Sequence, residues 1–446
     1  MRASMLRAAV LLVVAAPACA APRDGGDCAS AEADRRIAGC TRIIQDLGET
    51  ARMRAGALIN RALAYRAKGE LDRAIADYSE AIRIDPRYAD AYYNRAIAFK
   101  AKGDLDRAIA DYNEAIRLNP RDALAYNNRG IAYRAKGEID RAIADYDEAI
   151  RLDPGNALLY SQRGYAYQAK GNLEAAIADY SETIRLDPRD ALAHNNRGIA
   201  YQAKGDFAGA IIEYDEAIRL DPGNALAHYN RAIAYRSVGD LERAIADYDA
   251  AIRLDPARSL AYSQRGHAYQ ARGDALSALA DFSEAIRLDP KNIWAYQNRG
   301  IVYLYGGLLD KARADFRQAA ELAPKDPYCA LWLEIAERRS GVPGHLAEAS
   351  RQLTLTAWPG PLVRLFLGET SLAATLAAAH VADATRGRRK ACDANLYGAE
   401  LAILQGRNDE ALELYRLAAG ECPNDFIEWT TANAALRELG VTPYLQ

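Results

Sequence analysis

Apolar residues recur along the chain at a spacing that fits helices, and the whole pattern repeats every 34 residues. In residues 131–150, isoleucine, alanine and tyrosine recur at helical spacing, so they form apolar stripes along helices. Proline recurs at 34-residue steps from Pro86 to Pro324, and glycine does so from Gly69 to Gly307. A fixed period of this length indicates a solenoid of stacked helical hairpins.

Eight regular repeats are expected over residues 55–326, and their positions are numbered here from 1 to 34. The repeats begin at Ala55, Ala89, Ala123, Ala157, Ala191, Ala225, Ser259 and Ile293. Position 20 is always alanine, position 8 is glycine or alanine, and positions 11 and 24 are tyrosine or phenylalanine. Small residues at 8 and 20 predict two closely packed helices per repeat, with aromatic side chains filling the space between neighbours. Glycine at position 15 ends the first helix and proline at position 32 ends the second.

The period, the alanine at position 20 and the proline at position 32 resemble the tetratricopeptide repeat (TPR) family over residues 55–326. The resemblance implies an all-α fold, namely a right-handed superhelical solenoid of antiparallel helix pairs. It also implies that the first helix of each repeat lines a concave groove. The expected function is that of a protein-protein interaction scaffold or adaptor that binds extended peptide segments, and not that of an enzyme.

Position 6, on the groove-lining helix, is a carboxamide in every regular repeat. The residues are Asn60, Asn94, Asn128, Gln162, Asn196, Asn230, Gln264 and Asn298. Asparagine is a poor helix former, so its repetition at one register needs an explanation. An amide can both donate and accept, so it can pair with a peptide backbone. The row is similar to the asparagine ladder of O-linked N-acetylglucosamine transferase. The alternative is that repeat duplication copied amides that bond neighbouring helices.

Opposite charges also recur, with arginine at position 7 and an acid at position 23 of all eight repeats. This constant pairing predicts a structural ladder of exposed ion pairs between helices, each worth about 0–1 kcal/mol. Positions 5 and 9, which also face the predicted groove, carry no lysine or arginine. A receptor for C-terminal carboxylates is therefore not predicted.

Residues 1–20 have the pattern of a secretory signal peptide. Arg2 and Arg7 flank the start, an apolar run follows, and Ala18-Cys19-Ala20 fits a cleavage site. A rival cleavage before Cys19 would leave that cysteine lipidated and anchored to the outer membrane, but the residues that precede it fit this motif poorly. We therefore expect a periplasmic or secreted protein that contacts a membrane only if Cys19 is lipidated.

Residues 21–54 are expected to form an N-terminal capping half-repeat. Extending the period backwards places Cys28 at position 8 and Cys40 at position 20, which are the two close-contact positions of a hairpin. We therefore predict a disulfide between them, which export would permit. It would stabilise the cap by about 2–3 kcal/mol.

Three segments follow the regular repeats. They are an irregular helical segment (327–391), an additional TPR-like repeat (392–425) and a C-terminal capping helix (426–446). Cys392 is expected to start the first helix of the additional repeat and Cys422 to end the second, which predicts another disulfide. Cys329 is then left over, either buried or free to pair between chains.

This C-terminal region carries a second resemblance, to the NlpI-type TPR envelope lipoproteins. The matching stretches are Leu331-Trp332-Leu333, Leu365–Gly368, Asn395–Gly398 and Asn424–Glu428. Those proteins are adaptors that dimerise and bring a periplasmic protease to peptidoglycan hydrolases. The resemblance implies an envelope adaptor whose candidate partners are a periplasmic protease, cell-wall hydrolases and a second copy of the chain.

The remaining composition narrows the function further. With 57 Lys and Arg against 60 Asp and Glu, the chain has a net charge of −3 and lacks the basic balance of a nucleic-acid-binding protein. No motif for zinc, a P-loop or a serine nucleophile occurs, so no metal, cofactor or catalytic residue is expected. His267, at position 9, is expected to touch ligand or solvent. The alternatives are a structural, self-associating envelope protein and an enzyme in the C-terminal region.

Overall fold

The computed structural model describes residues 24–380, 384–423 and 426–442. Within these ranges every regular element is a helix and there is no strand, which confirms the predicted all-α class. The predicted signal peptide and Cys19 lie outside the described residues. The chain divides into two compact units, Met1–Ala193 (unit 1) and His194–Gln446 (unit 2).

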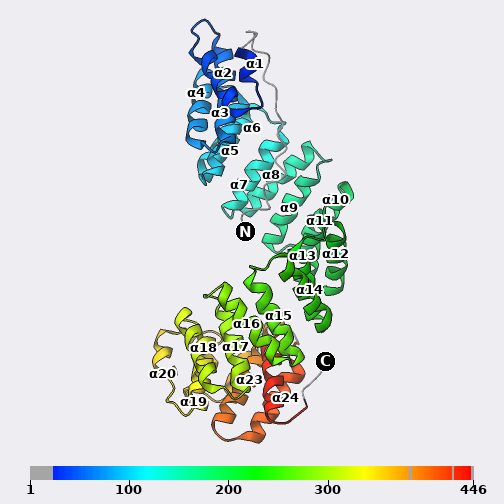
Figure 1. The fold of residues 1–446 in the computed structure, drawn as a ribbon, viewed down its shortest axis with the longest axis vertical. Coiled ribbons are helices and arrows are strands. Elements are labelled where there is room, and N and C mark those ends of the chain that lie inside the picture. The colour runs from blue at the N-terminus through cyan, green and yellow to red at the C-terminus, as the bar shows by residue number, and fades with distance from the viewer. Residues whose placement is uncertain (1–23, 381–383, 424–425, 443–446) are drawn as a thin grey trace. The chain divides into compact units, whose positions relative to one another are not determined.

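Unit 1 consists of consecutive antiparallel helix pairs (Figure 1). Its helices are α1 (Asp24–Cys28), α2 (Ala33–Gln45), α3 (Ala51–Ala67), α4 (Leu71–Ile84), α5 (Ala89–Ala101), α6 (Leu105–Leu118), α7 (Ala123–Ala135), α8 (Ile139–Leu152), α9 (Ala157–Lys170) and α10 (Leu173–Leu186). Helix α11 (Ala191–Ala203) starts at its end. Helix α3 begins four residues before Ala55, because the Thr50 hydroxyl accepts a hydrogen bond from the Met53 N–H and caps the helix there.

The small residue at position 8 permits close helix approach within a repeat, as predicted, and it packs against the aromatic residue at position 24 of the same repeat. A Cβ atom added to Gly130 would lie 2.8 Å from Cε1 of Tyr146, so only a small residue fits between α7 and α8. The aromatic side chain at position 24 is fully buried in every regular repeat. These residues are Tyr78, Tyr112, Tyr146, Tyr180, Tyr214, Tyr248, Phe282 and Phe316. Gly137, at position 15, has a φ of +81°, which is the left-handed cap expected of glycine there.

Unit 2 continues the same architecture. Its regular helices are α12 (Phe207–Leu220), α13 (Ala225–Ser237), α14 (Leu241–Leu254), α15 (Ser259–Arg272), α16 (Ala275–Leu288), α17 (Ile293–Tyr305) and α18 (Leu309–Leu322). Each first helix packs against the second helix of its own repeat and against the second helix of the repeat before it. The core of unit 2 then extends into the C-terminal region.

The 34-residue period continues one helix further than the sequence analysis expected. Helix α19 (Pro327–Arg339) starts 34 residues after α17, and Gly341 caps it with a φ of +71°. Position 8 is Glu334 here, a buried carboxylate that accepts a hydrogen bond from the Leu346 N–H at 3.0 Å. A side chain of this size leaves no room for a closely packed second helix. Short helices follow instead: α20 (Leu346–Ala349), η1 (Ser350–Gln352), α21 (Gly360–Phe366) and α22 (Leu372–Ala379).

The additional repeat is formed by α23 (Ala384–Leu404) and α24 (Asn408–Glu421). The expectation that Cys392 starts the first helix is wrong, because Cys392 lies inside α23. The preceding run is rich in alanine, arginine and lysine, which favour helix, so α23 begins earlier. Cys422 follows α24 directly and forms the predicted disulfide with Cys392.

The other cysteines also have defined places. Cys28 and Cys40 form the predicted disulfide of the N-terminal cap, with Cα atoms 4.5 Å apart. Cys329 is a free thiol on α19 and is buried, so the first of its two predicted alternatives holds. It accepts a hydrogen bond from the Gln297 amide at 3.2 Å.

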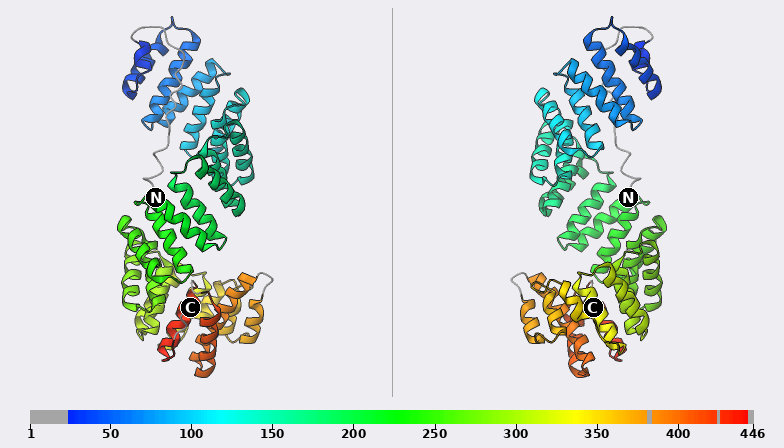
Figure 2. Two further views of the ribbon diagram at one scale, coloured as in Figure 1. Left: turned by 90° about the vertical axis from the view of Figure 1, so that its right-hand side faces the viewer. Right: turned by 90° about the vertical axis from the view of Figure 1, so that its left-hand side faces the viewer.

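The last helix, α25 (Ile427–Glu438), packs on α24 and also lies against the regular repeats of unit 2 (Figure 2). Its Thr430 hydroxyl is 3.4 Å from Nε2 of His267 on α15, and both residues are buried. Trp429 and Leu436 share one hydrophobic core with Ile301 of α17. Helix α25 therefore covers the face of α15 and α17 that the sequence assigned to the groove.

None of the helices in the described ranges is long and apolar enough to cross a membrane.

Candidate binding groove

The first helix of each repeat has two distinct faces, one that packs against the second helix and one that does not. Position 7 pairs with the second helix of the same repeat, and position 8 lies against the buried aromatic residue of that helix. Positions 2, 5, 6, 9 and 12 are spaced by three or four residues, so they form a different stripe on the same helix. We call this stripe the inner face.

The arginine at position 7 and the acid at position 23 form the predicted ladder. Arg129 Nε and a terminal guanidinium nitrogen donate to the two carboxylate oxygens of Asp145 at 2.8 and 2.6 Å. The same pairing is recorded for the other repeats: Arg61–Asp77, Arg95–Asp111, Arg163–Asp179, Arg197–Glu213, Arg231–Asp247, Arg265–Asp281 and Arg299–Asp315. The expectation of exposed pairs is wrong, because the acids are buried between helices. This ladder belongs to the architecture and not to the inner face.

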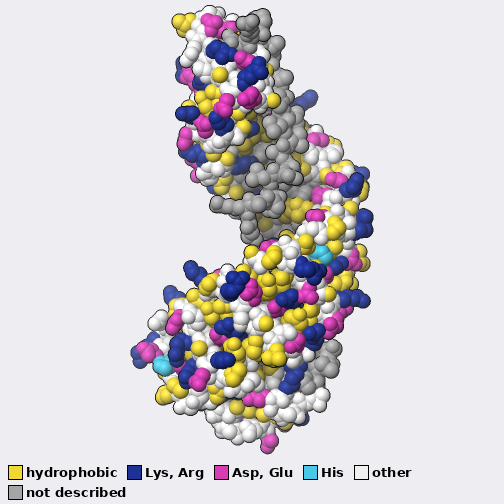
Figure 3. All heavy atoms as spheres, viewed as in Figure 1, with side chains coloured by type: hydrophobic (Ala, Val, Ile, Leu, Met, Phe, Trp, Pro, Cys, Tyr) yellow, Lys and Arg dark blue, Asp and Glu magenta, His cyan; other side chains and the backbone are white. Residues whose placement is uncertain are grey.

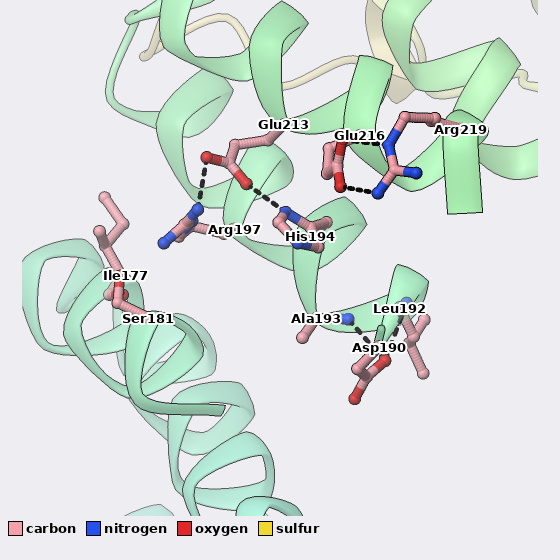
Figure 4. A network of polar contacts seen from close by, with 10 residues as sticks. All are labelled: Ile177, Ser181, Asp190, Leu192, Ala193, His194, Arg197, Glu213, Glu216 and Arg219. Carbon is pink, nitrogen blue, oxygen red and sulfur yellow. Dashed lines mark hydrogen bonds and ion pairs between the residues drawn. The ribbon is translucent and has the colours of Figure 1, made fainter. Parts of the chain in front are cut away.

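Two histidines join the ladder in unit 2, His194 and His228. His194 Nδ1 lies 2.9 Å from Oε2 of Glu213, while Arg197 donates to Oε1 at 2.6 Å (Figure 4). Burial alone would raise the pKa of the Glu213 carboxyl, but the two hydrogen bonds lower it. His228 and Arg231 act on Asp247 in the same way.

The position-6 amides of unit 1 are half-buried on the inner face and are bonded within the chain. Both N–H groups of the Asn128 amide are in use, because Nδ2 donates to the Tyr93 hydroxyl and to the Leu124 carbonyl, each at 3.0 Å. Its oxygen accepts from the Lys100 ammonium at 2.8 Å. Asn128 therefore offers a ligand mainly its remaining acceptor capacity.

A row of cations at position 12 supplies these inter-repeat bonds, and the sequence analysis missed it. Arg66 donates to Asn94 at 3.1 Å, and Arg134 donates to Gln162 at 3.2 Å, just as Lys100 donates to Asn128. Burial lowers the pKa of the Lys100 ammonium. The sequence signal for this row is a basic residue at position 12 of each of the first three repeats.

The inner face also exposes a row of leucines at position 2. In unit 1, Leu124, Leu158 and Leu192 are 40%, 49% and 51% exposed. In unit 2, Leu226 and Leu260 are 39% and 57% exposed. Large apolar side chains at one register of a helix stripe mark an interaction surface better than scattered ones do.

The inner face of unit 2 is partly covered. Asn298 is fully buried, and the amide oxygen of Gln264 is buried without a hydrogen-bond partner. The expectation that His267 touches ligand or solvent is wrong, because α25 covers it and burial lowers its pKa well below the usual value. Asn196 is also buried, whereas Asn230 is half-buried and donates to the Asn195 amide at 3.1 Å.

Figure 3 shows basic and acidic side chains interspersed over the visible surface of unit 2, without a single-sign patch. Many of these charges belong to exposed pairs within one helix turn, such as Arg219 with Glu216 at 2.5 Å. In the described residues, no three histidine, cysteine or acidic side chains are grouped so that they could hold a metal ion.

Comparisons with known proteins agree with this architecture. Family models described as TPR repeat and tetratricopeptide repeat match residues 62–103, 93–157, 161–225, 225–257, 260–292 and 282–314. No curated protein matches the chain.

Several solved structures are similar to parts of the chain. The MamA protein has 29% identity and a TM-score of 0.35, covering 38% of this chain and 92% of MamA. YrrB, described as a TPR protein with an unusual peptide-binding site, has 23% identity and a TM-score of 0.36, covering 41% and 95%. A tetratricopeptide repeat protein from Parabacteroides merdae has 21% identity and a TM-score of 0.46, covering 56% and 98%.

The matched family segments together span more than half of the chain, and the helix pairs have the architecture of a protein-protein interaction scaffold. The chain belongs to the tetratricopeptide repeat family.

Proposed function

We propose that this chain is an exported adaptor that binds segments of partner proteins on the inner faces of its regular repeats. The observation that carries the proposal is the exposed leucine row at position 2, next to the amides at position 6. A partner that covers Leu124 and Leu158 would remove their exposed apolar surface from water, which favours binding. The neighbouring amides would orient the partner's polar groups.

The open part of this surface differs between the units. In unit 1, Asn60, Asn94, Asn128 and Gln162 are all half-buried on α3, α5, α7 and α9. In unit 2, α25 already lies on α15 and α17, where Asn298 and the amide oxygen of Gln264 are buried. The proposed ligand therefore binds unit 1, and in unit 2 it binds only the part around Asn230 and Leu226.

Export is supported by the cysteines. Disulfides persist in oxidising compartments, and the described residues of this chain contain two of them. Together with the signal-like residues 1–20, they favour the periplasm or secretion. Within that setting, the resemblance of the C-terminal region to envelope adaptors suggests a periplasmic protease and cell-wall hydrolases as partners, with a homodimer as a further assembly.

The test is affinity capture from the native cell envelope, with bound proteins identified by mass spectrometry. The bait is the mature chain, compared with a variant that carries Leu124→Ser and Leu158→Ser. We expect partners captured by the unchanged chain to be lost from the variant. A protease or a peptidoglycan hydrolase among those lost partners would support the adaptor role.

A control removes apolar side chains that are even more exposed but lie on second helices. Ile212 on α12 and Leu276 on α16 are 66% and 83% exposed, so Ile212→Ser with Leu276→Ser changes the same kind of surface outside the inner face. This control should keep the partners. Equal capture by all three baits would contradict binding on the inner face.

A further inference from the structure

The residue at position 12 of the regular repeats affects both a hydrogen bond in the core and the charge on the inner face. In repeats 4 and 5 it is glutamine, and the side chain accepts a hydrogen bond from the buried tyrosine at position 24. Tyr180 donates to Gln168 at 2.9 Å in unit 1, and Tyr214 donates to Gln202 at 3.1 Å in unit 2. Glutamine at this position therefore satisfies a hydroxyl that is otherwise enclosed by the repeat.

Where position 12 is basic, that bond is absent. The repeats with Arg66 and Lys100 contain Tyr78 and Tyr112, whose hydroxyls are buried without a hydrogen-bond partner. A buried polar atom without a partner lowers stability. These repeats thus lack a core hydrogen bond, and they instead have a cation that donates to the amide of the next repeat.

The cations at position 12 also differ from other basic residues of unit 1. Position 7 arginines face acids at position 23, and Lys68, Lys102 and Lys136 pair with aspartates. Among the described residues, no ion pair joins Arg66, Lys100 or Arg134 to a carboxylate, and each of them donates to a neutral amide of the next repeat. The Arg134 guanidinium also lies over the Tyr165 ring, 5.7 Å from its centroid.

We propose that the inner face of unit 1 selects acidic polypeptide segments, with Arg66, Lys100 and Arg134 as the groups that bind their carboxylates. This inference rests on the proposed function and names the chemistry of its ligand. A partly desolvated cation without a counter-charge gains more from a carboxylate than a solvated one does. The exposed Leu124 and Leu158 at position 2 would hold apolar side chains of the same segment.

The acids nearest to this row do not neutralise it. Asp90 lies at position 2 of α5, ten residues before Lys100, which corresponds to about 15 Å along a helix. Asp90 is exposed, and burial of its carboxyl together with the charge of Asp122 raises its pKa. The two ends of α5 therefore have different charges, and the basic end is free to pair with a ligand.

The chain itself supplies a substitution for the test. Arg66→Gln, Lys100→Gln and Arg134→Gln, combined in one variant, place at position 12 the residue that repeats 4 and 5 already carry. Because glutamine can accept the tyrosine hydrogen bond, this variant should melt at the same temperature or higher. The matched control, Lys68→Gln with Lys102→Gln and Lys136→Gln, removes the same charge from exposed pairs.

The experiment selects random 12-residue peptides by display on the full-length protein and then measures the affinity of the enriched peptides. We expect enrichment of aspartate and glutamate, and affinity that falls with salt. The position-12 variant should bind these peptides at least tenfold more weakly, while the control variant should stay within twofold.

Enriched peptides without acidic residues, or equal affinity for the position-12 variant, would overturn the inference. If such peptides still needed Leu124 and Leu158, the proposed function would stand alone. Selection of no peptide would count against both. Binding of a single-stranded oligonucleotide as tightly as the acidic peptides would show attraction to any polyanion, and would also overturn the inference.

Discussion

Arg129 and Asp145 join the two helices of the third repeat through two parallel hydrogen bonds of 2.8 and 2.6 Å. The planar guanidinium matches the carboxylate, and the pair is enclosed between α7 and α8. Because the same pair recurs in the other repeats, it fixes the angle at which each hairpin closes. Its strength depends on burial, which the sequence does not show.

Removing one partner of this pair should be costly. Arg129→Met leaves the buried Asp145 carboxylate without its cation, so we expect the free energy of unfolding to fall by about 2–4 kcal/mol. Urea titration followed by circular dichroism measures this change. As a control, Arg151→Met breaks the exposed pair with Glu148 and should cost less than about 1 kcal/mol. Similar losses in both variants would show that burial does not strengthen the ladder.

Gly164 should not accept a branched side chain. A Cβ atom there would lie 2.8 Å from Cε1 of Tyr180, which is fully buried and cannot move aside. We expect Gly164→Val to destabilise the chain by about 2–3 kcal/mol through overpacking, measured as a shift of the urea midpoint.

Gly155 provides the comparison, because a Cβ atom added to this turn residue would meet no atom within 4 Å. Gly155→Val should change stability by less than about 1 kcal/mol. A change of the same size at both glycines would argue against the close approach of α9 and α10. Alanine should be tolerated better at Gly164, since Ala62 and Ala96 occupy position 8 in other repeats.

The carboxyl groups of Glu428 on α25 and Asp393 on α23 are buried, and each affects the pKa of the other. Burial and the neighbouring acid raise the pKa of Glu428 well above its usual value. Tyr328 and Trp358 donate to Asp393 at 2.6 and 2.8 Å, and these hydrogen bonds lower the pKa of Asp393. The positive charge of Arg389 lowers the pKa of both acids.

Stability should therefore fall as the pH rises. The folded state holds the Glu428 proton more tightly than the unfolded chain, so this contribution is complete below about pH 4.5 and is lost through the raised pKa. Glu428→Gln removes the ionisation and should stabilise the chain at pH 8 by at least about 1 kcal/mol. Urea titrations between pH 5 and pH 8 measure this. As a control, Glu348→Gln changes an exposed acid and should keep the original pH dependence. If Glu428→Gln also kept it, the raised pKa of Glu428 would not be its cause.

Cys329 should be unreactive in the folded protein. Burial, with a smaller effect of Asp326, raises the pKa of its thiol to about 12, so little thiolate exists at pH 8. We expect Ellman's reagent to modify it at least about 100-fold more slowly in buffer than in urea. Leu47→Cys adds a thiol at a side chain that is 90% exposed, and it should react at once. Rapid reaction of Cys329 in buffer would contradict its burial.

Much of the fold could be predicted, because a repeat protein is held together by contacts between near neighbours. The spacing of Gly130 and Tyr146 within one repeat is enough to predict the close approach of their helices. The pairing of Cys28 with Cys40, and of Cys392 with Cys422, followed from the same register. The expectation that Cys392 starts a helix failed, since helix ends depend on local residues that lie outside the period.

The candidate site could be predicted only in part. The row of amides that contains Asn128 was visible in the sequence, but its hydrogen bonds to Lys100 and Tyr93 were not, because they join separate repeats. The basic residues at position 12 could have been noticed as well. Whether a lysine points to a ligand, an acid or an amide is a matter of side-chain direction, which periodicity does not give.

The sequence by itself determined the helices, the 34-residue repeat and the two disulfides, since each depends on residues at most one repeat apart. Only the tertiary structure decided which part of the inner face stays open. Thr430 meets His267 across 163 residues of sequence, and no periodic pattern connects them. Helix α25 reaches α15 and α17 because the chain after α19 leaves the regular stacking and folds back. That return contact covers His267 and leaves the amides of unit 1 as the surface that a partner can reach.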